Sequence, residues 1–134
     1  MRLLSYASGL SENGGESWCR GCIIQEGFQP PLLQVVFRDP LDTSRVMRAD
    51  FTWRLGDGRT VVLEYDGLVK FRAKTMTRGR SVEHVVDDER SREKALSRAG
   101  VSLVIRTNYK QVGERDTLIS SLLEVGIPRR PVAL

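Results

Sequence analysis

The sequence contains few of the residues that build disulfide frameworks and zinc sites. Its 134 residues include two cysteines and one histidine. A closed structural zinc site needs about four Cys or His ligands, so only a site shared between two subunits would satisfy the metal. Two cysteines three positions apart do not make the disulfide framework of a small secreted domain. Aromatic residues are also sparse, at 7%, and no predicted helix stands out as a base-reading element.

Long apolar runs are absent as well. No stretch approaches the roughly 18 apolar residues of a membrane-spanning helix, and the first residues are too short an apolar run for a signal peptide. We therefore expect a soluble, cytoplasmic protein with no membrane partner. The length fits one domain over residues 1–134. The net charge of +4 is compatible with a polyanionic partner.

Hydrophobic periodicity and turn residues predict the element order α-β-β-β-α-β-α. The predicted elements are a helix over 16–26, strands over 33–38, 46–55 and 60–66, a helix over 82–99, a strand over 101–106 and a helix over 114–125. The GDG turn at 56–58 predicts a hairpin. A three-stranded meander with a helical crossover into a fourth strand makes an α/β fold with a mixed sheet flanked by helices.

Three elements carry expectations about burial. Strand 101–106 is nearly all apolar, which is typical of a strand buried on both faces. The strand over 46–55 alternates, so its apolar residues should share one face. These residues are Met47, Ala49, Phe51, Trp53 and Leu55. The apolar stripe expected on helix 82–99 consists of Val82, Val85, Val86, Leu96 and Ala99.

The segment Trp-Cys-Arg-Gly-Cys at 18–22 has the spelling of a thioredoxin-like redox motif. In such a site the motif follows a buried strand and sits at a helix N-terminus, which lowers the pKa of the first thiol. Here a polar, glycine-rich segment precedes it. We therefore favour Cys19 and Cys22 as small buried residues that, with Trp18, pack helix 16–26 onto the sheet. Glu16 then lies at the N-terminal end of that helix.

Three acidic residues lie on the polar faces of the second and third strands. Paired strands lie about 4.8 Å apart. If the GDG hairpin pairs these strands, Asp50 and Glu64 can be cross-strand neighbours on one face, and Asp66 follows on the same face as Glu64. Two carboxylates so close repel each other unless a cation lies between them, and oxygen-only ligands suit Mg²⁺ or Mn²⁺. The alternatives are solvated acids, or acids paired with Arg48 and Arg54. The apolar surroundings favour a site, because a buried acid needs a partner.

Several short motifs occur in an order that resembles a known family. They are Glu16, Gln34, Arg-Ala-Asp-Phe (48–51), Val-Leu-Glu-Tyr-Asp-Gly (62–67), Arg-x-x-x-Leu (92–96), Gly100 and Arg106. Together they resemble the PD-(D/E)XK nuclease superfamily, with its restriction-endonuclease-like αβββαβ(α) core. The branch they resemble most is the very-short-patch-repair-like endonuclease domains. The resemblance covers about residues 11–124. Because related domains often form the C-terminal part of longer proteins, and Glu16 lies close to the start of this chain, the resemblance implies that residues 1–134 are such a part.

The resemblance implies a Mg²⁺- or Mn²⁺-dependent DNA endonuclease without a small-molecule cofactor. Asp50 and Glu64 would match the two metal-binding acids, and Glu16 the helical acid that some members use for the metal or its water. The metal would activate water and neutralise charge on the scissile phosphate. Cleavage of both DNA strands would favour a homodimer.

The chain departs from the family pattern at the motif lysine, whose position holds Asp66. Asp66 would bind metal or shape the following loop, and Lys70 or Gln34 would substitute for the lysine. Glu89 and Arg92 interrupt the apolar stripe of helix 82–99. They would form a second polar layer behind the acids, or an ion pair that only holds the helix.

A basic segment follows the third strand and carries no acid between its first and last basic residue. Its basic residues are Lys70, Arg72, Lys74, Arg78 and Arg80. Such a segment would follow a nucleic-acid backbone, or would be an ordinary solvated loop. Two further functions stay open. One is a degenerate nuclease fold that binds nucleic acid or a partner protein without cutting, for example in a toxin–antitoxin or phage-defence regulator. The other is a domain kept for protein–protein contact.

Overall fold

The computed structural model of the protein describes residues 14–66 and 82–130. Its elements, in chain order, are α2 (Gly14–Gln25), β1 (Leu32–Asp39), β2 (Asp42–Arg54), β3 (Thr60–Asp66), α4 (Val82–Arg98), β4 (Leu103–Asn108), α5 (Tyr109–Gly113) and α6 (Arg115–Glu124). The predicted order is confirmed, with the short α5 as an addition. No helix in the described ranges is long and apolar enough to span a membrane.

The four strands form one mixed sheet in the order β1-β2-β3-β4. β2 pairs antiparallel with both β1 and β3, and β3 pairs parallel with β4 after the crossover through α4. The GDG hairpin between β2 and β3 is confirmed. β2 begins at Asp42, four residues before the predicted start, so the turn between β1 and β2 consists of Pro40 and Leu41 alone. Gly27, two residues after the end of α2, adopts a φ of 84°.

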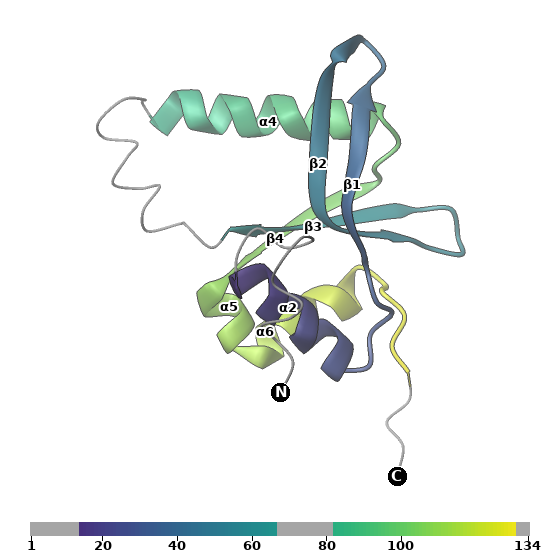
Figure 1. The fold of residues 1–134 in the computed structure, drawn as a ribbon, viewed down its shortest axis with the longest axis vertical. Helices are drawn as coiled ribbons and strands as arrows, with labels where there is room; N and C mark the ends of the chain where they lie inside the picture. The colour runs from purple at the N-terminus through teal and green to yellow at the C-terminus, as the bar shows by residue number, and fades with distance from the viewer. Residues whose placement is uncertain (1–13, 67–81, 131–134) are drawn as a thin grey trace.

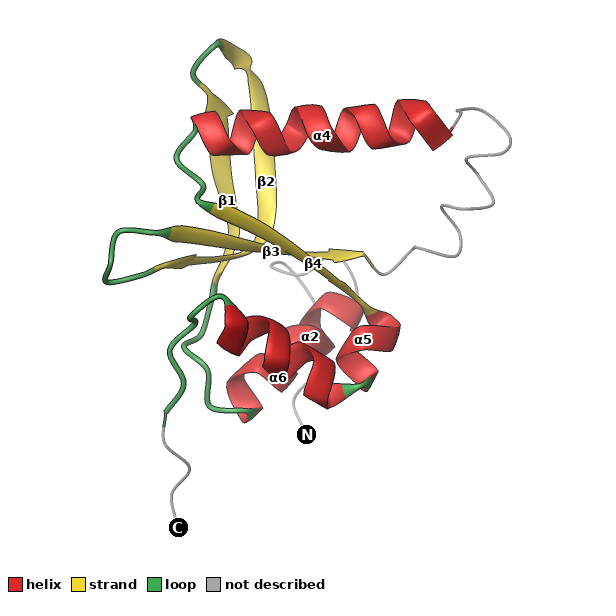
Figure 2. Ribbon diagram, turned by 180° about the vertical axis from the view of Figure 1, so that it is seen from behind, coloured by secondary structure: helices red, strands yellow, loops and turns green. Residues whose placement is uncertain are grey.

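Helices cover the sheet on both sides and give the molecule two apolar cores. α2, α5 and α6 lie together on one side of the sheet, and α4 crosses the upright β1–β2 hairpin on the other (Figures 1 and 2). The larger core joins Trp53, Phe51 and Leu63 to Cys19, Cys22 and Ile23 of α2 and to Leu118 and Leu122 of α6. The smaller core joins Phe37, Met47, Ala49 and Val62 to Ala95 and Leu96 of α4.

The apolar residues of β2 do not share one face, contrary to the expectation from alternation. Met47 and Ala49 pack in the core under α4, whereas Phe51 and Trp53 pack in the opposite core. The change falls between Ala49 and Phe51, where the pairing of β2 with β3 ends. Beyond this point the β1–β2 hairpin stands away from β3 and β4 (Figure 1). In β1 the same change occurs at Gln34, whose φ of 52° is the one positive value among the described non-glycine residues.

Two burial expectations are wrong. β4 is an edge strand paired only with β3, and it begins at Leu103, a residue that is 38% exposed, so it is not buried on both faces. Val86 of α4 is 37% exposed, whereas Ala95 and Leu96 are fully buried. The reason is that α4 contacts the sheet through its C-terminal half, over the β1–β2 hairpin. The side chains of residues 82–85 lie outside the described part.

Candidate active site

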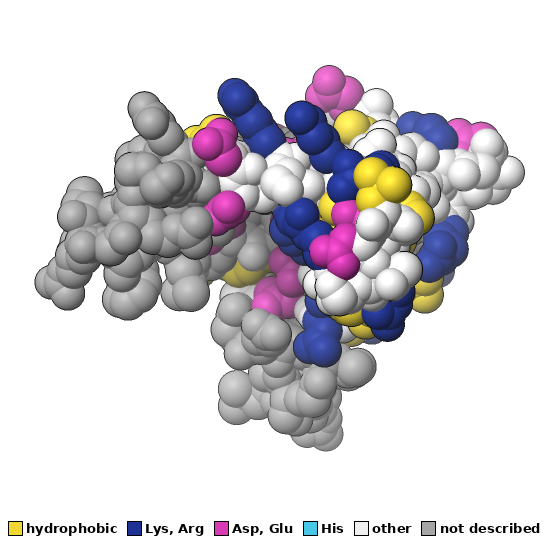
Figure 3. Space-filling view, turned by 90° about the horizontal axis from the view of Figure 1, so that it is seen from above, with side chains coloured by type: hydrophobic (Ala, Val, Ile, Leu, Met, Phe, Trp, Pro, Cys, Tyr) yellow, Lys and Arg dark blue, Asp and Glu magenta, His cyan; other side chains and the backbone are white. Residues whose placement is uncertain are grey.

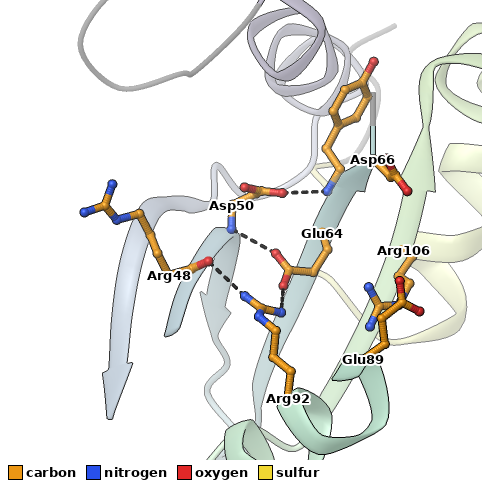
Figure 4. A pocket seen from close by; sticks show the side chains of 8 residues that line it. Arg48, Asp50, Glu64, Asp66, Glu89, Arg92 and Arg106 are labelled. Atoms are coloured by element: carbon orange, nitrogen blue, oxygen red, sulfur yellow. Dashed lines mark hydrogen bonds and ion pairs between the residues drawn. The ribbon is translucent and has the colours of Figure 1, made fainter. Parts of the chain in front are cut away.

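The ladder between β2 and β3 ends at the point where β2 turns away. The last paired residues on that side are Phe51 and Leu63, and one step further the register places Asp50 opposite Glu64. There, hydrogen bonds from backbone N–H groups to side-chain carboxylates replace the backbone–backbone hydrogen bonds of the ladder. The Asp50 N–H donates to Glu64 Oε2 at 3.3 Å, and the Tyr65 N–H donates to Asp50 Oδ2 at 2.8 Å (Figure 4). The turn in the sheet therefore holds the two predicted acids side by side.

Gln34 and Glu16 adjoin these acids from the side of α2. Gln34 lies between two paired positions of β1 and β2, directly opposite Asp50. Its Nε2 donates to Glu16 Oε1 at 3.2 Å, and the polar Gln34 side chain acts to lower the pKa of Asp50. Glu16 stands in the first turn of α2 and is 5% exposed. The helical acid is thus connected to the site through Gln34.

Arg92 reaches the acids from α4. Its Nη1 donates to Glu64 Oε1 and forms an ion pair with it, while Nη2 donates to the backbone carbonyl of Arg48 at 3.0 Å (Figure 4). One turn further along α4, Ala95 and Leu96 are buried in the smaller core. The helix therefore places this guanidinium between β2 and β3. The ion pair of Glu64 in the structure is with Arg92, a partner outside the Arg48 and Arg54 alternative.

A pocket of about 260 Å³ opens around these groups. The residues that line it are Arg48, Asp50, Glu64, Tyr65, Asp66, Glu89, Arg92 and Arg106. Four carboxyl groups and three guanidinium groups therefore surround one space. The face of the molecule seen from above carries Lys and Arg side chains interspersed with Asp and Glu (Figure 3).

The sequence interpretation missed Arg48 and Arg106 as pocket residues. Arg106 pairs in register with Glu64 across the parallel β3–β4 ladder. Alternation along β2 already placed Arg48 on the face of Asp50, so the signal for it was present. The pocket does include Asp66, at the position where the family resemblance would expect a lysine, and Glu89 of α4. Lys70, Arg72, Lys74, Arg78 and Arg80 all lie outside the described residues.

The electrostatics of the site centre on Asp50. Burial raises the pKa of the Asp50 carboxyl above its ordinary value, and the negative charge of Glu64 adds to the increase. The Tyr65 N–H, the Gln34 side chain and the positive charge of Arg92 act in the opposite direction. A cation bound next to Asp50 would favour the ionised form, because it would offset both the burial and the repulsion.

The donor set fits a hard divalent cation held by two carboxylates. Mg²⁺ commonly binds through one or two carboxylates and completes its octahedron with waters and phosphate oxygens. Asp50 and Glu64 supply such oxygens at the open side of the sheet. Over residues 14–66 and 82–130 no group of three or more His, Cys, Asp or Glu side chains is placed to hold a metal. A cation here would therefore depend on water or substrate for its remaining ligands.

The cysteine motif packs as the sequence predicted. Cys19 and Cys22 are free thiols, 0% and 2% exposed, in the core that also holds Phe51 and Leu63. Burial raises the pKa of the Cys19 thiol, with the nearby Cys22, Asp50 and Glu16 adding to the effect. Such a thiol is not ionised at neutral pH, so it is a poor nucleophile. The structure supports the packing role.

Comparisons with protein-family models, with curated proteins and with solved structures find no match to this chain.

Proposed function

We propose that the chain is a divalent-metal-dependent DNA endonuclease with a restriction-endonuclease-like core. The observation that carries the proposal is the pairing of Asp50 and Glu64 at the end of the β2–β3 ladder. Two carboxylates are held together in a partly buried place, in an open pocket with arginines on its walls. A purely structural pair of acids has no need of such a pocket. The order of motifs along the chain gives the same assignment.

Each side chain has a defined part in this proposal. Asp50 and Glu64 would hold Mg²⁺ or Mn²⁺, which when bound supplies an activated water and neutralises charge on the phosphate. Gln34 lies opposite Asp50 and donates a hydrogen bond to Glu16, while Arg92 forms an ion pair with Glu64. Arg106, on the neighbouring strand, would neutralise phosphate charge on the DNA backbone.

The first test is nicking of supercoiled plasmid with Mg²⁺ or Mn²⁺. Asp50→Asn and Glu64→Gln keep the size of each side chain and remove its charge. Because the proposed metal loses an anionic ligand in either variant, we expect nicking to fall at least about 100-fold, the scale on which loss of one key electrostatic group acts. Glu124→Gln, an exposed acid of α6, is the matched control and should nick as the unaltered chain does.

Nicking that persists in both variants would remove Asp50 and Glu64 from the active site. Nicking that does not depend on added divalent metal would remove the metal from the proposal. Thermal unfolding of each variant, measured in the same buffer, separates loss of the site from loss of the fold.

One observation favours the second candidate function, DNA binding without cleavage. Arg92 already supplies Glu64 with a positive partner, so the acid pair is partly neutralised without a metal. A degenerate nuclease fold would keep the Arg92–Glu64 ion pair, and it would bind DNA even when a chelator removes divalent metal. Fluorescence anisotropy with labelled duplex in EDTA, combined with absence of nicking in Mg²⁺ and in Mn²⁺, would support this candidate over the first.

A further inference from the structure

Arg92 makes two bonds to different strands with one guanidinium. Nη1 binds Glu64 of β3, and Nη2 binds the Arg48 carbonyl of β2. The side chains of Arg92 and Glu64 are 28% and 12% exposed, so the pair is largely withdrawn from water. Solvent screening is therefore weaker here than for a surface ion pair, and the interaction is correspondingly stronger.

Both carboxylate oxygens of Glu64 are in use. Oε1 accepts from Arg92, and Oε2 accepts from the backbone N–H of Asp50. The Asp50 N–H belongs to the backbone at the point where the ladder ends, so it keeps its place when side chains rearrange. Arg92 is held by rotatable side-chain torsions. A cation that takes Glu64 Oε1 must therefore displace or share the guanidinium.

The charge balance of the pocket is close. Four carboxyl groups, of Asp50, Glu64, Asp66 and Glu89, face three guanidinium groups, of Arg48, Arg92 and Arg106. Removal of the Arg92 side chain would leave four carboxyl groups and two guanidinium groups, and Glu64 would lose its counter-ion. The pocket would then attract a divalent cation more strongly.

We propose that Arg92 is the built-in counter-ion of Glu64, and that a divalent cation binds the acid pair in competition with it. Arg92 is then a positioning residue that limits metal affinity and keeps Glu64 neutralised while no metal is bound. This inference rests on the proposed metal site. It predicts that loss of Arg92 tightens metal binding, whereas a residue that merely orients Glu64 for the metal would weaken binding when removed.

The test measures Mn²⁺ binding to the full chain at neutral pH, without DNA, by calorimetry and by the electron paramagnetic resonance signal of free Mn²⁺. Arg92→Met keeps the hydrocarbon stem and removes the charge, and Arg92→Gln also keeps a hydrogen-bond donor. We expect about tenfold tighter Mn²⁺ binding in both, because the hydrogen-bonded ion pair no longer opposes the cation. Arg92→Lys keeps the charge and should bind within a few-fold of the unaltered chain.

Two controls tie the effect to Glu64. Arg90→Gln removes an exposed arginine from the same helix and should leave Mn²⁺ affinity unchanged. Glu64→Gln combined with Arg92→Met should lose the gain, because the acid that Arg92 neutralises is gone. Equal or weaker Mn²⁺ binding by folded Arg92→Met and Arg92→Gln overturns the inference. Circular dichroism and thermal unfolding establish that the variants are folded.

The outcome separates this inference from the nuclease proposal. If the Arg92 variants bind Mn²⁺ more tightly but the chain never nicks plasmid, the counter-ion role is supported and the nuclease proposal is contradicted. Metal-dependent nicking in a chain whose Mn²⁺ affinity is unaffected by Arg92 keeps the nuclease and overturns the counter-ion role. Absence of Mn²⁺ binding in every variant overturns the inference, and plasmid nicking then decides the nuclease proposal on its own.

Discussion

The backbone N–H of Tyr65 donates a hydrogen bond to the Asp50 carboxylate at 2.8 Å, just beyond Phe51 and Leu63, the last paired residues of β2 and β3. Asp50 therefore stabilises the fold at this position, in addition to any chemical role that it has at the site. Its carboxylate gives Tyr65 the acceptor that the strand partner no longer offers. The cost of this arrangement is a partly buried charge whose pKa is raised, chiefly by burial.

Asp50→Ala and Asp50→Asn should therefore differ in stability. Alanine leaves the Tyr65 N–H without its side-chain acceptor, which should lower the free energy of unfolding by about 1–3 kcal/mol. Asparagine keeps an acceptor oxygen and removes a charge that is costly to ionise in this place, so it should be at least as stable as aspartate at neutral pH. Urea unfolding of the two variants checks the order. Equal stability of the two would show that the Tyr65 bond contributes nothing measurable.

Gln34 offers a test of the strain at the turn of the sheet. Its φ of 52° lies in the left-handed region, and its side chain bonds to the buried Glu16. Gln34→Ala loses the bond and keeps the strain, so it should cost about 1–3 kcal/mol. Gln34→Gly loses the same bond but adopts the positive φ without strain, so it should unfold at a higher urea concentration than the alanine variant. The reverse order would contradict a strained backbone at this position.

The secondary structure of this chain could largely be predicted from its sequence, because hydrophobic periodicity and turn residues are local signals. β3 was predicted with its observed bounds, and the GDG turn located the hairpin. The turn of the sheet at Gln34 and Asp50 was not readable. Apolar residues alternate without interruption through Met47, Ala49 and Phe51, and alternation does not tell which layer of helices covers each residue.

The candidate site could also be predicted in part, because some of its residues stand out in the local sequence pattern. The acids Asp50 and Glu64 stood out because they interrupt apolar strands that a hairpin must pair. Arg92 was visible as a break in a helical stripe, but its ion pair with Glu64, 28 positions away, depends on how α4 crosses the sheet. The prediction started the last strand two residues early, so Arg106 was taken as its end rather than as the register partner of Glu64.

Two neighbouring glycines of α2 should respond oppositely to alanine. A Cβ on Gly15 would lie 2.5 Å from the Tyr65 hydroxyl, whereas a Cβ on Gly14 would meet nothing within 4 Å. Gly15→Ala should therefore destabilise the protein by about 1–3 kcal/mol through overpacking. Gly14→Ala should be neutral or stabilising by up to about 1 kcal/mol, because alanine favours the helix. Thermal unfolding of both variants checks the contrast, and equal effects would contradict close packing of α2 on Tyr65.

Asp39 should make the stability of the fold depend on pH in the acid range. Its carboxylate binds Arg98 Nη2 at 2.7 Å and Nε at 3.1 Å, and its side chain is 3% exposed. The Arg98 bond, with help from the Leu41 N–H, lowers the pKa of Asp39 to about 2 from an ordinary 3.8. Because the folded pKa lies below the unfolded one, the stabilisation is present above about pH 4 and is lost as pH falls towards 2.

Asp39→Asn should remove that contribution. The difference in unfolding free energy between Asp39→Asn and the unaltered chain should therefore be largest at neutral pH and shrink as pH falls through this window. Asp116→Asn, an exposed acid of α6, is the control and should show no such window. A difference that stays constant from neutral pH to pH 2 would show that the ion pair is not the source of the stabilisation.

The thiols of Cys19 and Cys22 should be inert in the folded protein. Both are buried, and burial raises the pKa of each above its ordinary value, so little thiolate is present at neutral pH. A thiol-reactive dye should label them slowly, at a rate that follows unfolding, and both should react at once in guanidinium chloride. Mild oxidation should leave them reduced, because a disulfide would have to form within the packed face of α2. Fast labelling of native protein, or a disulfide formed without unfolding, would restore the redox interpretation of Trp-Cys-Arg-Gly-Cys.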